Sequence, residues 1–354
     1  MKISVVLKNV TGLVFVALAL LSCSSARGEK RQEIEIIKKE SERKVDVLAG
    51  GKLITSFCWP ENVYKPVFYP VYTISGIEVT RGFPLKPRAG ERDDHIHQVG
   101  IWFNYGNVNR IDFWGNGSQG RKSENGGEIK LLNIDEIKGG QGEGLMRISA
   151  SWLDPMGKEL LSEKTEFNFI ARGNYYIIDR VTILTAQDTA VLMKDTKEGM
   201  YAIRVARQLE LPSKDDVSLL DQSGKPGSEK AAENIGVTGN YRSSEGMEGD
   251  AVWGTRARWM NLSGIINDEK VSIVICDHPD NISYPTYWHA RGYGLFSANP
   301  LGAVDFTQGN EVVDFSIPSR GSAAFKYRIV INSGSHLTDS EINAIADDFA
   351  ARYR

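Results

Sequence analysis

The chain has little cysteine and almost no net charge. Three of its 354 residues are cysteines, and 42 basic against 45 acidic side chains leave a formal net charge of −3. Neither Cys58 nor Cys276 sits in a CxxC or Cys/His ligand pattern, so neither predicts a metal ligand or a nucleophile. The charge balance gives no electrostatic reason to expect a nucleic-acid partner.

The common catalytic signatures are missing as well. The chain has no glycine-rich phosphate loop, no GxSxG nucleophile elbow and no HExxH helix. These absences argue against nucleotide-driven chemistry and against a serine hydrolase.

Long hydrophobic runs are absent except near the N-terminus. Lys2 and Lys8 precede the apolar run 10–21, which is a secretory signal pattern and too short for a comfortable membrane span. Cys23 follows directly and predicts lipidation, with 1–22 as signal peptide and 23–32 as tether. We expect a bacterial lipoprotein held to the outer membrane by acyl chains alone, facing the periplasm or the cell surface. An ordinary signal peptide with an incidental cysteine is the alternative.

The rest of the chain is rich in strand patterns. Polar and apolar residues alternate, and β-branched or aromatic segments recur between Gly, Pro, Asn and Asp turns. We expect strands over 33–37, 44–48, 53–59, 67–73, 128–137, 145–153, 159–171, 175–185, 200–211, 251–262, 271–276, 288–297, 312–317 and 323–331. Only the tail has helical spacing, with a cap at 339–341. The pattern predicts an all-β fold: one large two-sheet β-sandwich over 33–354, with a C-terminal helix and a polar surface insertion at about 212–233.

The densest polar cluster lies between Asp93 and Trp114. His95 and His97 are two residues apart, and on an extended segment both would project to one face together with Asp93. That spacing could offer two imidazoles to a divalent metal or to one substrate. A pair of polar residues that face solvent is the alternative.

Further candidate residues lie at the ends of later strands. Asp277 and His278 close one expected strand, and His289 follows a proline-bearing loop, so these residues could join the first two histidines. Glu198 precedes a glycine and is a candidate carboxylate base, although a turn acid is the commoner fate of such a residue.

Arginines and aromatic residues adjoin these clusters. Guanidinium groups suit carboxylates and vicinal oxygens, and flat indole faces hold sugar rings, although tryptophans also fill sandwich cores. The substrate-binding candidates are Trp102, Arg204, Arg256, Trp288, Arg291 and Asn299.

Several motifs resemble one bacterial family. The run from His95 to Phe103, followed by 106–109 and 112–114, is similar to the HHxGLWF and GDVNGxDFW signature of an uncharacterised family with a methane-oxygenase-like label (DUF6807). Segments 197–199, 203–206, 252–254, 277–279 and 285–302 resemble its later blocks. The chain departs in having Ile96 between the histidines and Asn107 where an aspartate is usual.

The resemblance implies a galactose-mutarotase-like supersandwich, in which histidines and a carboxylate act on sugars. The methane-oxygenase label would require several membrane spans, which the chain lacks after its signal. We therefore expect an enzyme of epimerase, lyase or hydrolase type that acts on carbohydrate or a sugar-derived acid. His95, His97, His278, His289 and Glu198 would be catalytic. A divalent metal on His95, His97 and Asp277 is a further possibility, and a non-catalytic glycan-binding lipoprotein is the alternative.

Overall fold

The computed structural model describes residues 30–117, 122–214, 216–231 and 234–354. The expected signal peptide, the lipidation residue Cys23 and most of the tether lie outside the described residues. Within the ranges given, no helix is long and apolar enough to cross a membrane.

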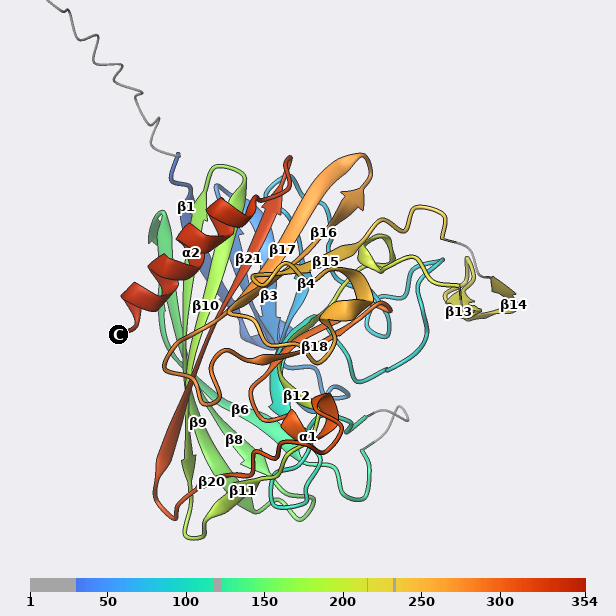
Figure 1. Cartoon of the computed structure of the whole chain (residues 1–354). Coiled ribbons are helices and arrows are strands. Elements are labelled where there is room, and N and C mark those ends of the chain that lie inside the picture. Colours follow the sequence, from blue (N-terminus) through green and yellow to red (C-terminus); the bar gives the residue numbers. More distant parts are fainter. Residues whose placement is uncertain (1–29, 118–121, 215, 232–233) are drawn as a thin grey trace, which may run out of the picture.

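Two large antiparallel sheets face each other and confirm the predicted sandwich (Figure 1). The nine-stranded sheet has the order β18-β19-β12-β5-β4-β3-β2-β1-β7. Its strands are β1 (Glu33–Lys39), β2 (Lys44–Ala49), β3 (Lys52–Cys58), β4 (Val67–Val71), β5 (Ile101–Tyr105), β7 (Gly140–Gln141), β12 (Gly199–Arg204), β18 (Tyr287–Arg291) and β19 (Leu295–Asn299).

The eight-stranded sheet has the order β15-β16-β17-β21-β10-β9-β8-β6. Its strands are β6 (Glu128–Lys138), β8 (Glu143–Leu153), β9 (Glu159–Arg172), β10 (Tyr175–Ala186), β15 (Asn240–Ser243), β16 (Trp259–Ile266), β17 (Glu269–Asp277) and β21 (Ser322–Ser333). Long antiparallel registers join these strands, such as Tyr175 to Thr185 of β10 against Asn332 to Ser322 of β21.

Small elements complete the fold. Two short pairs are β11 (Val191–Met193) with β20 (Phe315–Ile317), and β13 (Val217–Leu220) with β14 (Pro226–Ala231). The β13–β14 hairpin falls within the expected polar insertion and projects from the body in Figure 1. The helices are η1 (Glu40–Glu42), η2 (Arg207–Leu209), η3 (Gly249–Val252), α1 (Ala303–Phe306) and α2 (Asp339–Arg352).

Four of the expected strands differ clearly from those observed, and one of them, predicted over 312–317, begins only at Phe315. The strand predicted over 200–211 ends at Arg204, and the one predicted over 251–262 begins only at Trp259, because η3 and a turn precede it. The segment 288–297 is a hairpin, β18–β19, since Gly294 adopts a φ of +90° that suits a tight turn.

The core lies between the sheets, where side chains from alternate strand positions meet. Phe103 of β5 packs against Trp152 of β8 and Phe325 of β21, with ring centroids 6.1 and 5.8 Å apart. This aromatic layer fixes β5 in place, and β5 carries the segment that the sequence singles out.

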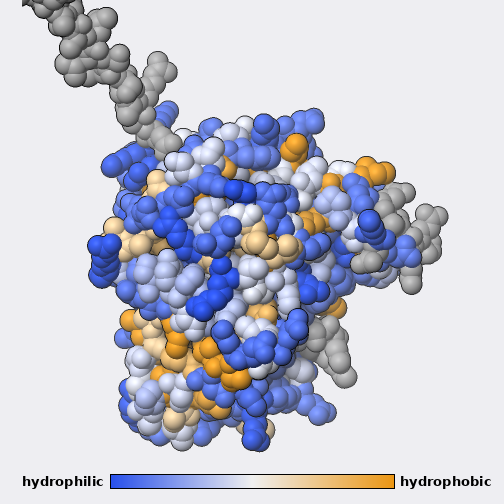
Figure 2. All heavy atoms as spheres, in the orientation of Figure 1, coloured by the Kyte–Doolittle hydropathy of each residue, from blue (hydrophilic) through white to orange (hydrophobic). Residues whose placement is uncertain are grey.

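The outer faces of the two sheets are covered differently. α2 packs on the eight-stranded sheet through Ile342, Ala346 and Phe349. It begins in a capping box of Thr338 and Glu341, one residue before the expected cap at Asp339. Below α2, hydrophobic residues gather at the surface (Figure 2), and Ile183 of β10 remains 44% exposed. On the nine-stranded sheet, loops and the short helix α1 take this place, with Phe306 of α1 stacked on Tyr287 of β18 at 5.4 Å.

Candidate functional site

The segment with the first two histidines is a loop on the outer face of the nine-stranded sheet. His95 has a φ of +44°, and the backbone N–H of Gln98 bonds to its carbonyl oxygen at 2.9 Å, which closes a turn. The expected extended geometry is therefore wrong, because β5 begins only after Gly100. Gly100 has a φ of +58°, and a Cβ there would lie 2.1 Å from the carbonyl oxygen of Phe68. The two imidazoles nevertheless meet, with ring centroids 5.9 Å apart.

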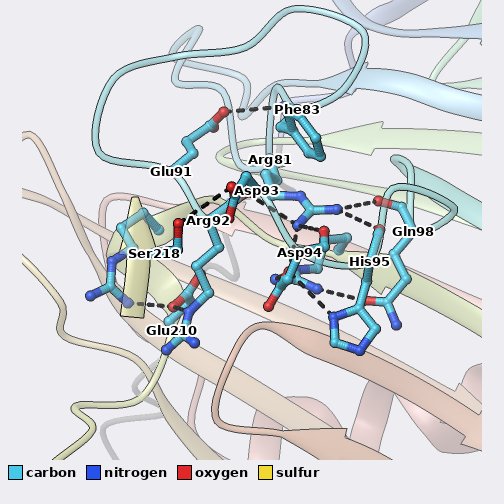
Figure 3. A network of polar contacts seen from close by, with 12 residues as sticks. Arg81, Phe83, Glu91, Arg92, Asp93, Asp94, His95, Gln98, Glu210 and Ser218 are labelled. Atoms are coloured by element: carbon cyan, nitrogen blue, oxygen red, sulfur yellow. Dashed lines mark hydrogen bonds and ion pairs between the residues drawn. The ribbon is translucent and has the colours of Figure 1, made fainter. Parts of the chain in front are cut away.

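Two buried arginines hold this loop through one carboxylate (Figure 3). Arg81 and Arg204 donate to Oδ1 of Asp94 at 2.8 and 2.6 Å. Arg81 also donates to the carbonyl oxygens of His95 and Gln98 at 2.9 and 3.0 Å. Burial alone would raise the pKa of Asp94, but the hydrogen bond from His95 and the two guanidinium groups hold it well below its usual range.

Asp94 and Tyr293 orient the imidazole of His95 from two sides. Nδ1 of His95 lies 3.3 Å from Oδ1 of Asp94, and its ring stacks on Tyr293 at 4.8 Å with an interplanar angle of 6°. The side chain remains 39% exposed. The carboxylate partner assigns the proton to Nδ1 and leaves Nε2 available, which is the arrangement of an oriented acid–base histidine. Asp93 instead turns toward β13, where Ser218 donates to it at 3.3 Å.

The second histidine lies over a buried lysine. Nζ of Lys65 donates to the carbonyl oxygen of His97 at 2.7 Å, and this lysine is only 3% exposed. Burial lowers the pKa of Lys65 to about 7. Burial, and then the charge of Lys65, lower the pKa of His97 to about 2, so its imidazole is neutral at physiological pH. Nδ1 of His97 is buried and has no hydrogen-bond partner among the described residues.

A third imidazole reaches the same face from β18. Nδ1 of His289 lies 2.9 Å from the carbonyl oxygen of Lys197, which assigns the proton to Nδ1 and leaves Nε2 as an acceptor. Its ring lies parallel to Trp114 at 6.3 Å. Burial, followed by the nearby Arg291, lowers the pKa of His289 to about 3, so this ring is neutral too.

Two carboxyl groups complete the cluster. Glu198 immediately precedes β12, and burial raises its pKa despite Nζ of Lys197 at 3.3 Å from Oε1. Burial also raises the pKa of Asp112, whose Oδ1 accepts the backbone N–H groups of residues 114 and 115, each at 2.8 Å. Glu198 lies close against the backbone of Gly106, where a side chain would not fit, since a Cβ there would lie 2.6 Å from Cβ of Glu198.

Two indoles lie beneath these groups. Trp102 and Trp114 pack at 5.3 Å, both are almost fully buried, and neither indole N–H has a partner among the described residues. Trp102, predicted to bind substrate, is therefore part of the floor of the site rather than an open platform.

The structure brings together much of what the sequence predicts. His95 is close enough to influence the pKa of His97, of His289 and of Glu198. We call His95, His97, His289, Glu198 and Asp112 the polar cluster. The predicted substrate ligand Arg204 lies behind it, fully buried and bonded to Asp94 and Gln98.

Asp277 and His278 lie elsewhere. They are at the end of β17 in the eight-stranded sheet, and the ring of His278 packs against Phe349 of α2 at 5.1 Å. Asp277 accepts hydrogen bonds from Asn281 and from the backbone N–H of Thr286, at 2.7 and 2.9 Å. The expected grouping of these residues with the first histidines is wrong, because the two sheets separate them.

Three predicted substrate ligands bond within the protein. Trp288 is a core residue that donates to the carbonyl oxygen of Ala257 at 3.0 Å. Asn299 is buried and donates to the carbonyl oxygen of Thr196 at 2.9 Å. Arg256 is exposed and donates to the carbonyl oxygens of residues 283 and 285. These contacts shape the loops around the site, and of the arginine candidates only Arg291 borders it openly.

No complete donor set for a metal is present in the described ranges. No group of three or more His, Cys, Asp or Glu side chains there could hold a metal ion. The predicted set fails because Asp277 lies on the other sheet.

Sequence reasoning missed the residues that support the cluster from below. Lys65 and Arg81 act through burial and through contacts with residues far along the chain, and neither lies in a motif with a chemical signature. Tyr293 belongs to the long run 285–302, and its aromatic character beside Arg291 was the only available signal.

Comparisons with known proteins give one sequence match and several distant structural likenesses. A model of the family of unknown function DUF6807 matches residues 44–347. No curated protein matches the chain.

Solved structures with some likeness include the Slr1438 protein of Synechocystis sp. PCC 6803, with 8% identity, a TM-score of 0.29, and coverage of 87% of this chain and 98% of that one. A β-arabinopyranosidase has 11% identity and a TM-score of 0.30, over 87% of this chain and 39% of its own. A galactose mutarotase related enzyme from Lactobacillus acidophilus has 10% identity and a TM-score of 0.26, over 85% and 98%. At such TM-scores the likenesses carry no argument about activity.

Proposed function

We propose an acid–base function on carbohydrate or a sugar-derived acid for this chain, which belongs to the family of unknown function DUF6807. The observation that supports it most is the pairing of neutral imidazoles with a carboxyl group of raised pKa on one face of the sheet. We further propose that the protein is a lipoprotein of the cell envelope, modified at Cys23. Loss of fatty-acid labelling in a Cys23→Ser variant would test this modification, and unchanged labelling would contradict it.

Glu198 and His95 form the proposed acid–base pair. A raised pKa makes the Glu198 carboxylate a stronger base, because proton-transfer efficiency rises as the pKa approaches the operating pH. Asp94 and Tyr293 orient His95, so its Nε2 can exchange a proton on the other side of a bound substrate. One group takes a proton from a carbon or hydroxyl next to a carbonyl or hemiacetal while the other delivers a proton to the oxygen. Solvent then restores both groups.

His97 and His289 bind the substrate in this scheme. A neutral imidazole can accept or donate a hydrogen bond without a charge, which suits the hydroxyl groups of a sugar. Nε2 of His289 is the acceptor, since its Nδ1 is bonded to the carbonyl oxygen of Lys197. The positive charges of Lys65 and Arg204 lower the pKa of His97, and the same charges would favour negative charge on a substrate oxygen bound beside that ring.

Turnover of a sugar panel by the mature chain tests this function. NMR in D₂O would follow exchange at carbon, anomer interconversion and bond cleavage for reducing sugars, uronic acids and glycosides. His95→Asn and Glu198→Gln variants should each lose about 100-fold to 10,000-fold in turnover, as expected for removal of an acid–base group. The Tm should change little, because both side chains are partly exposed.

An Arg320→Gln variant is the matched control, since Arg320 is an exposed residue that pairs only with Asp188 in a remote turn. Full activity in both His95→Asn and Glu198→Gln would contradict the proposed roles. Sugar affinity without any consumption would support a glycan-binding lipoprotein instead.

A further inference from the structure

A cavity of about 630 Å³ adjoins the polar cluster. Its walls are the turn between β18 and β19, the η3 segment and residues 211–214. Tyr293 lines the cavity and stacks on His95, so the cavity and the polar cluster share this aromatic wall. A ligand longer than one sugar unit could therefore occupy both.

The charges in the lining are unequal. Arg291 and Lys214 have no acidic partner and no side-chain hydrogen bond among the residues that the structure describes. A third cation, Arg92, is paired with Glu210 at 2.7 Å. Asp250 is the single acidic residue among the described residues of the lining. Two unpaired cations against one acid favour a ligand that carries negative charge.

Two aromatic rings hold the guanidinium group of Arg291 in place. The guanidinium carbon of Arg291 lies 5.7 Å from the ring centroid of Trp253 and 5.8 Å from that of Tyr293. Trp253 packs edge-on against Phe306 at 5.4 Å and is thereby fixed. Its indole N–H is buried without a partner in the described part of the chain. The guanidinium group is thus oriented by two rings and has no hydrogen-bond or ion-pair partner within the described ranges.

We infer that this cavity is a second sugar subsite, which binds an acidic sugar unit linked to the unit held by the polar cluster. Arg291 would pair with the carboxylate of that unit through its planar fork. Asp250 would accept hydroxyl hydrogens, and Trp253 would cover a C–H face of the ring. The inference rests on the proposed function and narrows its substrate to a glycoside with an acidic second unit.

Calorimetric titration of the mature chain with methyl β-D-glucuronide and with methyl β-D-glucoside tests the charge preference. The glucuronide should bind at least about ten-fold more tightly, since a charge-assisted hydrogen bond is worth about 1.5–3 kcal/mol. An Arg291→Gln variant should lose this preference, whereas Arg320→Gln should keep it. Asp250→Asn should weaken both ligands alike. A titration with glucose 6-sulfate shows whether any anionic sugar binds as tightly as the glucuronide.

Equal affinity for the two glycosides, or a preference that survives Arg291→Gln, would overturn the inference. Glucose 6-sulfate binding as tightly as the glucuronide would also overturn it, because the subsite would then recognise charge rather than a carboxylate. The proposed function has a separate test, since it depends on turnover and on the His95 and Glu198 variants. Turnover that is lost in the His95 and Glu198 variants, together with equal affinity for the two glycosides, would leave that function standing while the subsite is rejected.

Discussion

Two Asp–His pairs look alike in the sequence and differ in the folded chain. Asp94 and His95 lie in a loop on the outer face of the nine-stranded sheet, where the imidazole is partly open to solvent. Asp277 and His278 end a strand of the other sheet, and α2 covers them. Adjacent acids and histidines therefore indicate a reactive site only when the fold leaves the imidazole accessible.

The electrostatics of the two acids also differ in sign. Two guanidinium groups and a histidine surround Asp94, and its pKa falls despite burial. Asp277 has only uncharged N–H donors as hydrogen-bond partners, and burial raises its pKa to about 7. Burial raises the pKa of both acids, and charged hydrogen-bond partners, which only Asp94 has, reverse that effect.

The largest effect should come from removing the buried carboxyl group of Asp277. An Asp277→Ala variant leaves three N–H donors without their acceptor, and we expect a loss of about 3 kcal/mol in the free energy of unfolding. Urea denaturation measures this loss. His95→Asn, at the open pair, should cost less than about 0.5 kcal/mol because the side chain is exposed. Equal losses would remove the distinction between the two regions.

A smaller effect should appear as a pH dependence of the polar cluster. The pKa values of His97 and His289 are lowered in the folded chain from 6.5 to about 2 and about 3. Below pH 6.5 the unfolded chain takes up protons that the folded chain does not, so stability falls as the pH decreases. Between about pH 7 and about pH 5.5 the two histidines together should account for about 2 kcal/mol.

A His97→Asn/His289→Asn double variant should lose that part of the pH dependence, measured by denaturation at each pH against the unmodified chain. An identical pH profile in the double variant would show that the two imidazoles are not held neutral.

The smallest effect should come from weakening α2, the helix that covers Asp277 and His278. Thr338→Ala removes the side-chain acceptor of the capping box at the start of α2, and we expect a loss of about 1 kcal/mol. Thermal unfolding measures it. Turnover should not change, because α2 lies on the sheet opposite the polar cluster. A change in turnover without a change in Tm would connect the two regions after all.

The sequence predicts most of the strands because their signals are local. Alternation and β-branched residues mark β9 and β10, and the observed bounds agree closely with the expected ones. The predictions fail where a turn interrupts an apolar segment, as between β18 and β19, since apolar content alone does not show a reversal of the chain. The C-terminal helix was correct in type and displaced by one residue at its cap.

Of the candidate site, the sequence predicts only the side chains whose residue type suggests chemistry. His95, His97, His289 and Glu198 stand out by residue type and motif, and the structure gathers them on one face. Arg81 cannot be found in this way, because its role depends on contacts with a loop that the sequence leaves without a conformation. The sequence does not separate His278 from these residues either, since only the position of β17 in the other sheet places it away from His289.

The nine-stranded sheet is assembled from distant parts of the chain, so the polar cluster can form only after nearly the whole chain has been synthesised. β1 to β5 come from the first third of the sequence, whereas β18 and β19, which carry His289 and border Tyr293, come near its end. During synthesis, the loop that bears His95 and His97 emerges long before β18 and β19. A chain truncated before β18 would thus retain most of the strand signals but would lack His289 and Tyr293, and with them one side of the polar cluster.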